Sequence, residues 1–304
     1  MVCRQPGMVG TPEGQGLVLT MRVLVTGAAG QLGRDLVLHS QACGDDVLGC
    51  SHAELDVTDR SAVFGLVASW HPDVVIHAAA WTAVDLCESN PDRAYVANGL
   101  AVRWIAEACR QTSAHLVTVS TDYVFDGSLA RPYHEWDEPN PASAYGRSKL
   151  AGEREALSAG IGAGVVRTSW VCGEHGNNMV KTILRLANEH DHLSFVDDQR
   201  GHPTFTQDLA TALRRVAIDR RAGLYHITNQ GAVSWFEFAQ AVMEAAGHEP
   251  SRVHPVATKD LRPPRPAPRP VNSVLDNAVA RLAGLPPLDD FRVPLQRLVR
   301  RLIG

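Results

Sequence analysis

The chain has 304 residues, and its 33 acidic and 29 basic side chains nearly balance, without a basic stripe of the kind that binds nucleic acid. Six scattered cysteines form no C-x-x-C pair, which indicates neither a disulfide framework nor a structural zinc site and favours reduced thiols. No apolar run approaches the roughly 20 residues that cross a bilayer, so we expect a globular cytoplasmic protein with neither a nucleic-acid nor a membrane partner.

The first 20 residues are rich in glycine, proline and glutamine, and they lack the apolar stretch of a secretory signal. We therefore expect a flexible tail over residues 1–20. A β-branched run begins at residue 22, so Met21 is the expected structural start, and the sequence leaves the start codon open among Met1, Met8 and Met21.

Short apolar runs alternate with helical patterns from residue 22 to residue 170. Such alternation predicts an α/β fold with a doubly wound parallel sheet of the Rossmann type. Strands are expected over 22–26, 46–50, 73–77, 115–120 and 164–168, and helices from residue 31, over 60–69, over 91–111 and around Tyr145.

The turn after the first expected strand has a G-x-x-G-x-x-G pattern, formed by Gly27, Gly30 and Gly33. Glycines at these positions let backbone amides approach a pyrophosphate at the N-terminus of the following helix. A tight turn without a ligand is the alternative, and the flanking strand and helix favour the dinucleotide.

The end of the second expected strand lacks the carboxylate that would bind an adenosine ribose, since Ser51 and His52 follow it. Without that carboxylate to repel a 2′-phosphate, the pocket is expected to tolerate NADP. Asp56 lies nearby and is a candidate to meet the adenine, although a turn aspartate that caps the next helix explains it equally well.

Small residues and hydroxyl groups follow the next two expected strands. Alanines over 78–80 suit a backbone that passes close to a cofactor, although packing against a helix explains them as well. Ser120, Thr121 and Asp122 lie at the C-terminal end of the following strand, where open α/β sheets place their ligands. The Thr121 hydroxyl is a candidate to bind a substrate carbonyl oxygen, with a cap or turn as the alternative.

Tyr145 and Lys149 are four residues apart on an expected helix, so they share one face. We expect the Lys149 ammonium to lie beneath the Tyr145 phenol and to lower the pKa of that phenol from about 10, so that it acts as an acid or base at neutral pH. Such a pair arises by chance on many surface helices. Its position after the glycine turn and after Thr121 favours a nicotinamide-dependent carbonyl reductase.

The alternation loosens after Trp170, where helices are expected over 178–189, 207–218, 235–246 and 272–282, with one strand over 224–228. Five prolines between residues 262 and 270 predict an extended segment. We expect an NAD(P)-binding domain over residues 21–170, with segments near 200–230 returning to it, and a smaller, mainly substrate-binding lobe over 171–304.

Six stretches together resemble the extended short-chain dehydrogenases/reductases, and within them the family of dTDP-4-dehydrorhamnose reductases. They are TGAAGQLG (26–33), AAAWTAVD (78–85), STDYVFDG (120–127), YGRSKLAGE (145–153), RTSWV (167–171) and DDQRGHPT (197–204). The resemblance runs from Met21 almost to the C-terminus.

The resemblance implies a role for each matching residue. Tyr145 would be the proton donor, Lys149 its partner and a ligand of the nicotinamide ribose, and Thr121 the hydroxyl that polarises the keto group. Asp122 and Trp170 would contact the sugar, and Asn178 and Arg269 the nucleotide part of the substrate. The cofactor would contact Gly27, Gly30, Gln31, Leu32, Gly33, Ser51, Asp56, Val57, Ala80, Trp81, Thr82, Val119, Ser120, Tyr145 and Lys149.

The implied reaction is the reduction of dTDP-4-dehydro-β-L-rhamnose to dTDP-L-rhamnose by NADPH, with NADH as the other possible donor. The first alternative is another nucleotide-sugar 4-ketoreductase, an epimerase or a dehydratase. Related dehydratases have a glutamate after the Thr-Asp pair, where this chain has Tyr123. The second is a non-catalytic regulatory subunit, which an intact set of Tyr145, Lys149 and Thr121 disfavours.

The resemblance leaves Mg²⁺ and the oligomeric state open. Some relatives dimerise through magnesium bound by acidic residues, and Asp35 matches one such position. The C-terminal residues 300–304 offer no matching carboxylate. We therefore assign no metal ligand, and both a monomer and a homodimer fit the sequence.

Overall fold

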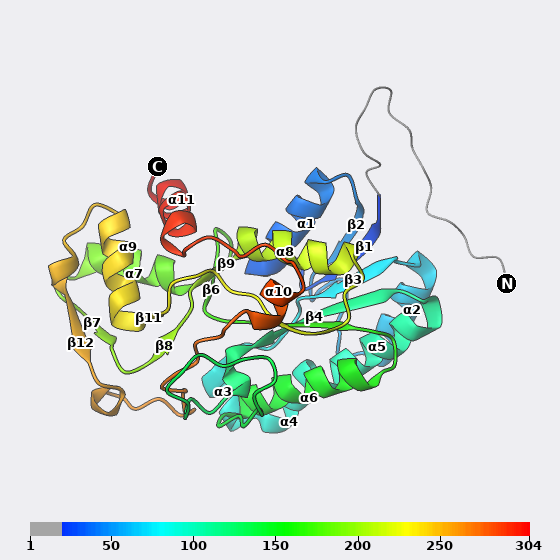
Figure 1. Cartoon of the computed structure of the whole chain (residues 1–304), viewed down its shortest axis with the longest axis horizontal. Coiled ribbons are helices and arrows are strands. Elements are labelled where there is room, and N and C mark those ends of the chain that lie inside the picture. Colours follow the sequence, from blue (N-terminus) through cyan, green and yellow to red (C-terminus); the bar gives the residue numbers. More distant parts are fainter. Residues whose placement is uncertain (1–19) are drawn as a thin grey trace.

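A six-stranded parallel sheet forms the centre of the larger lobe (Figure 1), in a computed structural model that describes residues 20–304. The strand order is β10-β5-β4-β3-β1-β2, so the chain reverses direction across the sheet at β1 and β3. The strands are β1 (Arg22–Thr26), β2 (Asp46–Cys50), β3 (Val74–His77), β4 (His115–Thr121), β5 (Gly164–Thr168) and β10 (Gly223–His226). This confirms the predicted Rossmann-type α/β fold. The predicted tail lies, apart from residue 20, outside the described residues.

Helices cover both faces of the sheet, because alternate strand residues point to opposite sides. Val25 and Ile76 pack on the face covered by α1 (Gln31–Ala42) and α8 (Thr206–Ile218). Leu24 and Val75 point the other way, toward α2 (Arg60–Trp70), α5 (Ala101–Thr112) and α6 (Ala144–Ser158). The continuous apolar runs of the central strands are therefore buried on both sides.

The helix predicted over residues 91–111 is interrupted in the structure. It consists of α4 (Pro91–Tyr95), a π-helical turn over Val96–Leu100, and α5; a short α3 (Val84–Ser89) precedes it. Within the π-helical turn, Asn98 donates to the carbonyl of Trp81 and accepts from the amide of Trp81, at 3.0 and 2.8 Å. The wider turn, a feature frequent at functional sites, thus fixes the backbone next to the strand ends.

Segments after Trp170 build a smaller lobe from three helices and three pairs of short strands (Figure 1). The helices α7 (Met179–Glu189), α9 (Trp235–Ala245) and α11 (Arg292–Ile303) enclose an apolar core around Ile183, Phe238 and Phe291. The strand pairs are β6 (Val171–Cys172) with β9 (Thr204–Phe205), β7 (Leu193–Val196) with β12 (Val253–Val256), and β8 (Arg200–Gly201) with β11 (Val233–Ser234).

The helix predicted over residues 272–282 is wrong for its first half. Only α10 (Ala278–Leu282) is helical, because the preceding residues pair with other segments through the bridges Arg200↔Asn272 and Tyr133↔Leu275. Short 3₁₀ turns lie at Asp122–Val124, Pro250–Arg252 and Thr258–Asp260.

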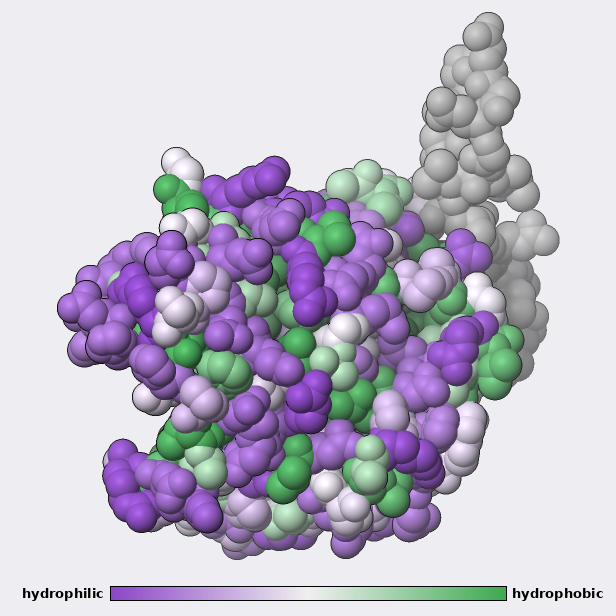
Figure 2. Space-filling view, turned by 60° about the vertical axis from the view of Figure 1, so that its left-hand side comes forward, coloured by the Kyte–Doolittle hydropathy of each residue, from purple (hydrophilic) through white to green (hydrophobic). Residues whose placement is uncertain are grey.

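The surface shown in Figure 2 is mostly polar, with apolar side chains in separate patches, as is usual for a globular protein. Among the helices that the structure describes, none combines the length and the apolar composition needed to cross a membrane.

Candidate active site

Two adjoining cavities lie at the carboxyl ends of the central strands. The inner cavity, of about 430 Å³, brings together predicted residues of the glycine turn, β4, α6 and the start of the smaller lobe: Gly27, Gly30, Gln31, Leu32, Gly33, Ala80, Thr82, Val119, Ser120, Thr121, Asp122, Tyr145, Lys149 and Trp170. The outer cavity, of about 720 Å³, is lined by Asp56, Val57 and Trp81 together with Gly27, Gly30 and Ala80. This edge of the sheet is where the strand order reverses, the usual ligand position in open α/β folds.

The glycine turn leaves no room for side chains. Gly27 has a φ of 71°, in the left-handed region, and a Cβ there would be 2.8 Å from the Cα of Ala79. A Cβ on Gly33 would collide with the carbonyl oxygen of Gly27. Gly30 is the N-cap of α1 without a side-chain cap, and no acidic residue lies in the first turn. These features fit a pyrophosphate held by backbone amides at a helix N-terminus.

The outer cavity contains one carboxylate among its lining residues, that of Asp56. Asp56 accepts hydrogen bonds from the amide and the hydroxyl of Thr58 at 2.9 and 2.7 Å, while Asp59 caps α2. Asp56 is therefore a turn residue that also faces the cavity. The basic residues His52 and Arg93 line the same cavity, and no sequence pattern indicated Arg93.

Ser51 lies beside the outer cavity without lining it. Its amide donates to the carboxylate of Glu54 at 2.7 Å, and Glu54 is not a lining residue either. The contact between Ser51 and the cofactor therefore stays a prediction.

Tyr145 and Lys149 both lie on the buried face of α6, with 8% and 5% of their surface exposed. The Lys149 ammonium donates to the carbonyl of Val119 at 2.7 Å. Burial lowers the pKa of Lys149 to about 8, and the charge of Glu153 opposes this shift. The hydrogen bond from Lys149 to Val119 therefore holds the face of α6 that contains Tyr145 against β4.

The expected direction of the pKa shift of Tyr145 is wrong. Burial raises the pKa of the phenol, the charge of Asp122 adds to this effect, and a hydrogen bond with the Thr121 hydroxyl only partly offsets it. The Lys149 ammonium donates to the carbonyl of Val119. Tyr145 is therefore a neutral phenol at neutral pH, the form that can donate a proton.

Thr121 and Asp122 end β4 inside the inner cavity. The Thr121 hydroxyl donates to a carboxylate oxygen of Asp122 at 3.0 Å and accepts from the amide of Tyr123 at 3.2 Å. Burial raises the pKa of Asp122 to about 6. Thr121 caps the 3₁₀ turn that follows and also lines the cavity, so its contact with a substrate carbonyl oxygen stays a prediction.

Trp170 enters the inner cavity as half of a stacked pair. Its indole lies on that of Trp235, with ring centroids 3.5 Å apart and planes at 8°. Trp170 has a φ of 45°, which is rare for a bulky residue, and a Cβ on Gly201 would be 2.6 Å from its ring. The strained backbone and the tight neighbour hold this indole at the cavity wall.

Trp170→Ala is expected to raise the KM for the substrate and to leave cofactor affinity almost unchanged, because the indole packs on Trp235 and beside Gly201, in the lobe where we expect the substrate to bind. If Trp170 served only as a core residue, the variant would instead lose about 3–5 kcal/mol of stability with an unchanged KM. Thermal melting beside steady-state kinetics separates the two roles. The control Trp70→Ala removes an indole of α2 that lines neither cavity and should lower the melting temperature alone.

Asn178 and Arg269 do not line either cavity. Asn178 caps α7, and its amide group donates to the side chain of Gln31, a lining residue, at 3.0 Å. Arg269 binds the carboxylate of Asp85 through two hydrogen bonds of 2.6 and 2.8 Å. Their predicted contacts with the substrate stay predictions.

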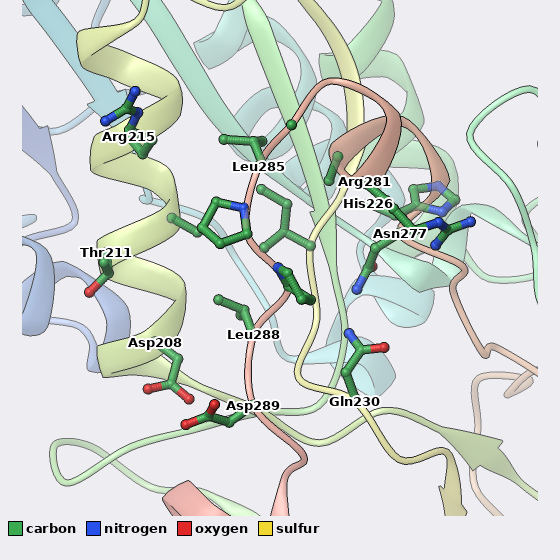
Figure 3. Close-up of a pocket in the computed structure, with 16 residues that line it drawn as sticks. Asp208, Thr211, Arg215, His226, Gln230, Asn277, Arg281, Leu285, Leu288 and Asp289 are labelled. Carbon is green, nitrogen blue, oxygen red and sulfur yellow. The ribbon is translucent and has the colours of Figure 1, made fainter.

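A third cavity, of about 660 Å³, lies between α8 and the loop around residues 284–289, as Figure 3 shows. None of the predicted site residues lines it. Its wall contains Arg215 and Arg281, which form ion pairs with Asp219 and Asp276. In the described part of the chain, no group of three or more His, Cys, Asp or Glu residues could hold a metal ion.

A parallel Rossmann-type sheet whose strand ends bring Tyr145 and Lys149 together beside a glycine turn defines the class of nicotinamide-dependent oxidoreductases. The chain belongs to the RmlD substrate binding domain family, whose model matches residues 21–303. The resemblance predicted from the sequence is thereby confirmed.

Two relatives and one solved structure illustrate the similarity. The dTDP-4-dehydrorhamnose reductase of Streptomyces griseus is 43% identical over 93% of this chain and 94% of its own length. A probable dTDP-4,6-dihydroxy-2-methyloxan-3-one 4-ketoreductase of Streptomyces antibioticus is 42% identical over 91% of this chain and 94% of its own length. The crystal structure of the Bacillus anthracis dTDP-4-dehydrorhamnose reductase in complex with NADP has a TM-score of 0.89 at 37% identity, and covers 93% of this chain and 99% of that chain.

Proposed function

We propose that the chain reduces dTDP-4-dehydro-β-L-rhamnose to dTDP-L-rhamnose with NADPH, the final step of dTDP-L-rhamnose synthesis. The observation that carries the proposal is the convergence of Tyr145, Lys149 and Thr121 on one cavity of a chain 43% identical to a dTDP-4-dehydrorhamnose reductase. Reduction of a ketone by a nicotinamide cofactor needs a bound dinucleotide and a proton donor at the carbonyl oxygen. The glycine turn and the hydroxyl groups of Tyr145 and Thr121 can supply these.

The cofactor supplies the hydride when it is bound. The amides after Gly27 and Gly30 would hold its pyrophosphate, Asp56 and Val57 would lie on the adenosine side, and the residues from Val119 to Thr121 would line the nicotinamide side. Lys149 would bind the nicotinamide ribose through its ammonium. The collisions that any Cβ at Gly27 or Gly33 would suffer support this fit.

Tyr145 would give its phenolic proton to the oxygen at C4 as that oxygen gains negative charge. Its neutral state favours this role, because only a protonated phenol can donate. The Thr121 hydroxyl would orient the same oxygen, and fixed donors of this kind stabilise developing charge without reorganisation. Trp170 would cover the apolar face of the deoxysugar.

The proposal is tested by adding dTDP-4-dehydro-β-L-rhamnose to the purified chain and measuring NADPH oxidation, with the product identified by mass spectrometry and NMR. The matched comparison is the 3,5-epimer, dTDP-4-dehydro-6-deoxy-D-glucose. Turnover of the L-sugar with formation of dTDP-L-rhamnose is the expected result. No turnover of any nucleotide-linked 4-ketosugar would instead favour a non-catalytic regulatory subunit.

A second candidate is reduction of another dTDP-linked 4-ketosugar. This candidate is supported by the 42% identity to a relative that is named as the probable 4-ketoreductase of a different sugar. The same assay with a panel of 4-ketosugars discriminates the two, because the true substrate should have the highest kcat/KM. Gel filtration with light scattering in EDTA and in Mg²⁺ would distinguish a monomer from a metal-linked homodimer.

NADPH is expected to support turnover at least as well as NADH. The lining of the outer cavity contains two basic side chains, and its one carboxylate, Asp56, is engaged by Thr58. The kcat/KM values for the two cofactors provide the measurement, and Glu54→Gln, outside the cavity, should leave their ratio unchanged. A strong preference for NADH would show that the ribose position is misassigned.

A further inference from the structure

One buried carboxylate joins the catalytic helix to two strands of the sheet. Glu153, 3% exposed, lies one helical turn beyond Lys149 on the face of α6 that also presents Tyr145. It accepts from the Ser120 hydroxyl at 2.5 Å and from Arg167 through two bonds of 2.8 and 2.7 Å. The sequence stretch YGRSKLAGE contains Glu153, and only the fold shows what it binds.

The two partners of Glu153 lie side by side in the sheet. Ser120 of β4 is in register with Arg167 of β5, and the next register pair is Thr121 with Thr168, both at the inner cavity. The side chain of Glu153 therefore binds both strands at the residues that directly precede Thr121 and Thr168. These hydrogen bonds therefore connect the position of Thr121 on β4 to that of Tyr145 on α6.

A buried ion pair is a poor source of stability, because removing two charges from water offsets most of their attraction. Arg167 is 2% exposed and also stacks on Phe125, 5.0 Å from the ring centroid. The nearby His226 lies within 3.4 Å of its guanidinium and reaches the third cavity. Because the buried Glu153–Arg167 pair contributes little stability and lies directly beside the inner cavity, its role is better explained as positioning the residues of that cavity.

Glu153 is also the negative charge next to Lys149. Among the other titratable groups, Tyr145 of α6 and Asp122 after β4 line the same cavity as Lys149, and His77 of β3 is close enough for the charge of Lys149 to lower its pKa. Burial holds His77 neutral, with a pKa of about 3 to which the charge of Lys149 contributes, and burial keeps Tyr145 neutral as well. Glu153 is the one group whose charge raises the pKa of Lys149 against its burial.

We propose that Glu153 is a positioning residue of the reduction, which binds Ser120 and Arg167 to α6 and thereby holds Thr121 in place relative to Tyr145 and Lys149. This inference rests on the proposed reductase activity, and the unaltered chain must first show that activity. Inactivity of the unaltered chain would refute the reaction, whereas the variants below address Glu153 alone.

The first variant is Glu153→Gln, which removes the charge and keeps the shape. Lys149 should then lose its proton at lower pH, so the basic limb of kcat/KM against pH should move down by about one unit. Activity should fall about tenfold further at pH 8.5 than at pH 6.5. Glu155→Gln, on the same helix but paired with Arg103 near the surface, should keep the profile of the unaltered chain.

The second variant replaces both partners, Glu153→Met with Arg167→Met, because apolar substitution of a whole buried pair tends to preserve folding. We expect a melting temperature close to that of the unaltered chain and a kcat at least about tenfold lower. A double variant with unaltered kcat, or a Glu153→Gln profile with an unmoved basic limb, would overturn the proposal. If Glu153→Gln does not fold, the double variant alone decides.

Discussion

Tyr145→Phe is expected to lower kcat about 100-fold or more, while NADPH affinity stays near that of the unaltered chain. The substitution removes only the hydroxyl whose proton would reach the C4 oxygen. It keeps the ring that packs edge-to-face on Tyr123, with centroids 5.7 Å apart. Steady-state turnover and fluorescence titration with NADPH are the measurements.

Tyr225→Phe is the matched control for this variant. Tyr225 is also buried, but its hydroxyl donates to the carbonyl of Ala222 at 3.1 Å, away from both active-site cavities. Its loss should leave kcat unchanged. Near-normal turnover by Tyr145→Phe would contradict the assignment of the proton donor.

Lys149→Ala is expected to weaken NADPH affinity and to lower kcat, each by about tenfold or more, because one ammonium would serve both the ribose and the catalytic cavity. The basic limb of the pH profile should disappear too. In the unaltered chain activity should fall as pH rises through about 8, where Lys149 loses its proton. Tyr145 cannot produce this limb, since burial raises its pKa above the usual value of about 10.

The control for Lys149→Ala is Lys259→Ala, which removes an exposed ammonium of the 3₁₀ turn Thr258–Asp260. It should alter neither NADPH affinity nor the pH profile. If Lys149→Ala left both the NADPH affinity and the pH profile of activity unchanged, the position of Lys149 on the same helix face as Tyr145 would have no role in catalysis.

The sheet was predictable because parallel strands buried on both faces appear as continuous apolar runs. β3, with four buried residues in a row, is the clearest example. The helix over 91–111 has one apolar pattern throughout, and nothing local signals the π-helical turn at Asn98. The segment 272–277 follows its tertiary partners at Arg200 and Tyr133 instead of its own helical pattern.

α11 was missed although its signal was present. Pro294, Leu295, Leu298 and Val299 are its buried residues, and their spacing describes one face of a helix. Reading residues 292–303 for helical periodicity would have found it.

In the candidate site, too, local features could be predicted from the sequence and contacts between distant segments could not. Motifs with short spacing, such as Gly27 to Gly33 and Tyr145 to Lys149, are visible in one dimension because their geometry is local. The contact of Trp170 with Trp235 and the grip of Glu153 on Arg167 join distant segments, so only the fold reveals them. The pKa of Tyr145 was mispredicted because sequence proximity to Lys149 says nothing of burial.

The way in which the chain returns to its first sheet has a consequence for its synthesis. The face of the sheet that contains Val25 and Ile76 is covered by α8, and its edge strand is β10, both from beyond residue 200. A ribosome adding about 5–20 residues per second leaves the part of that face that α1 does not cover exposed for many seconds after β1 emerges. The nucleotide-binding lobe therefore cannot complete its core co-translationally as an early unit, and the nascent chain offers a binding surface to chaperones until α8 arrives.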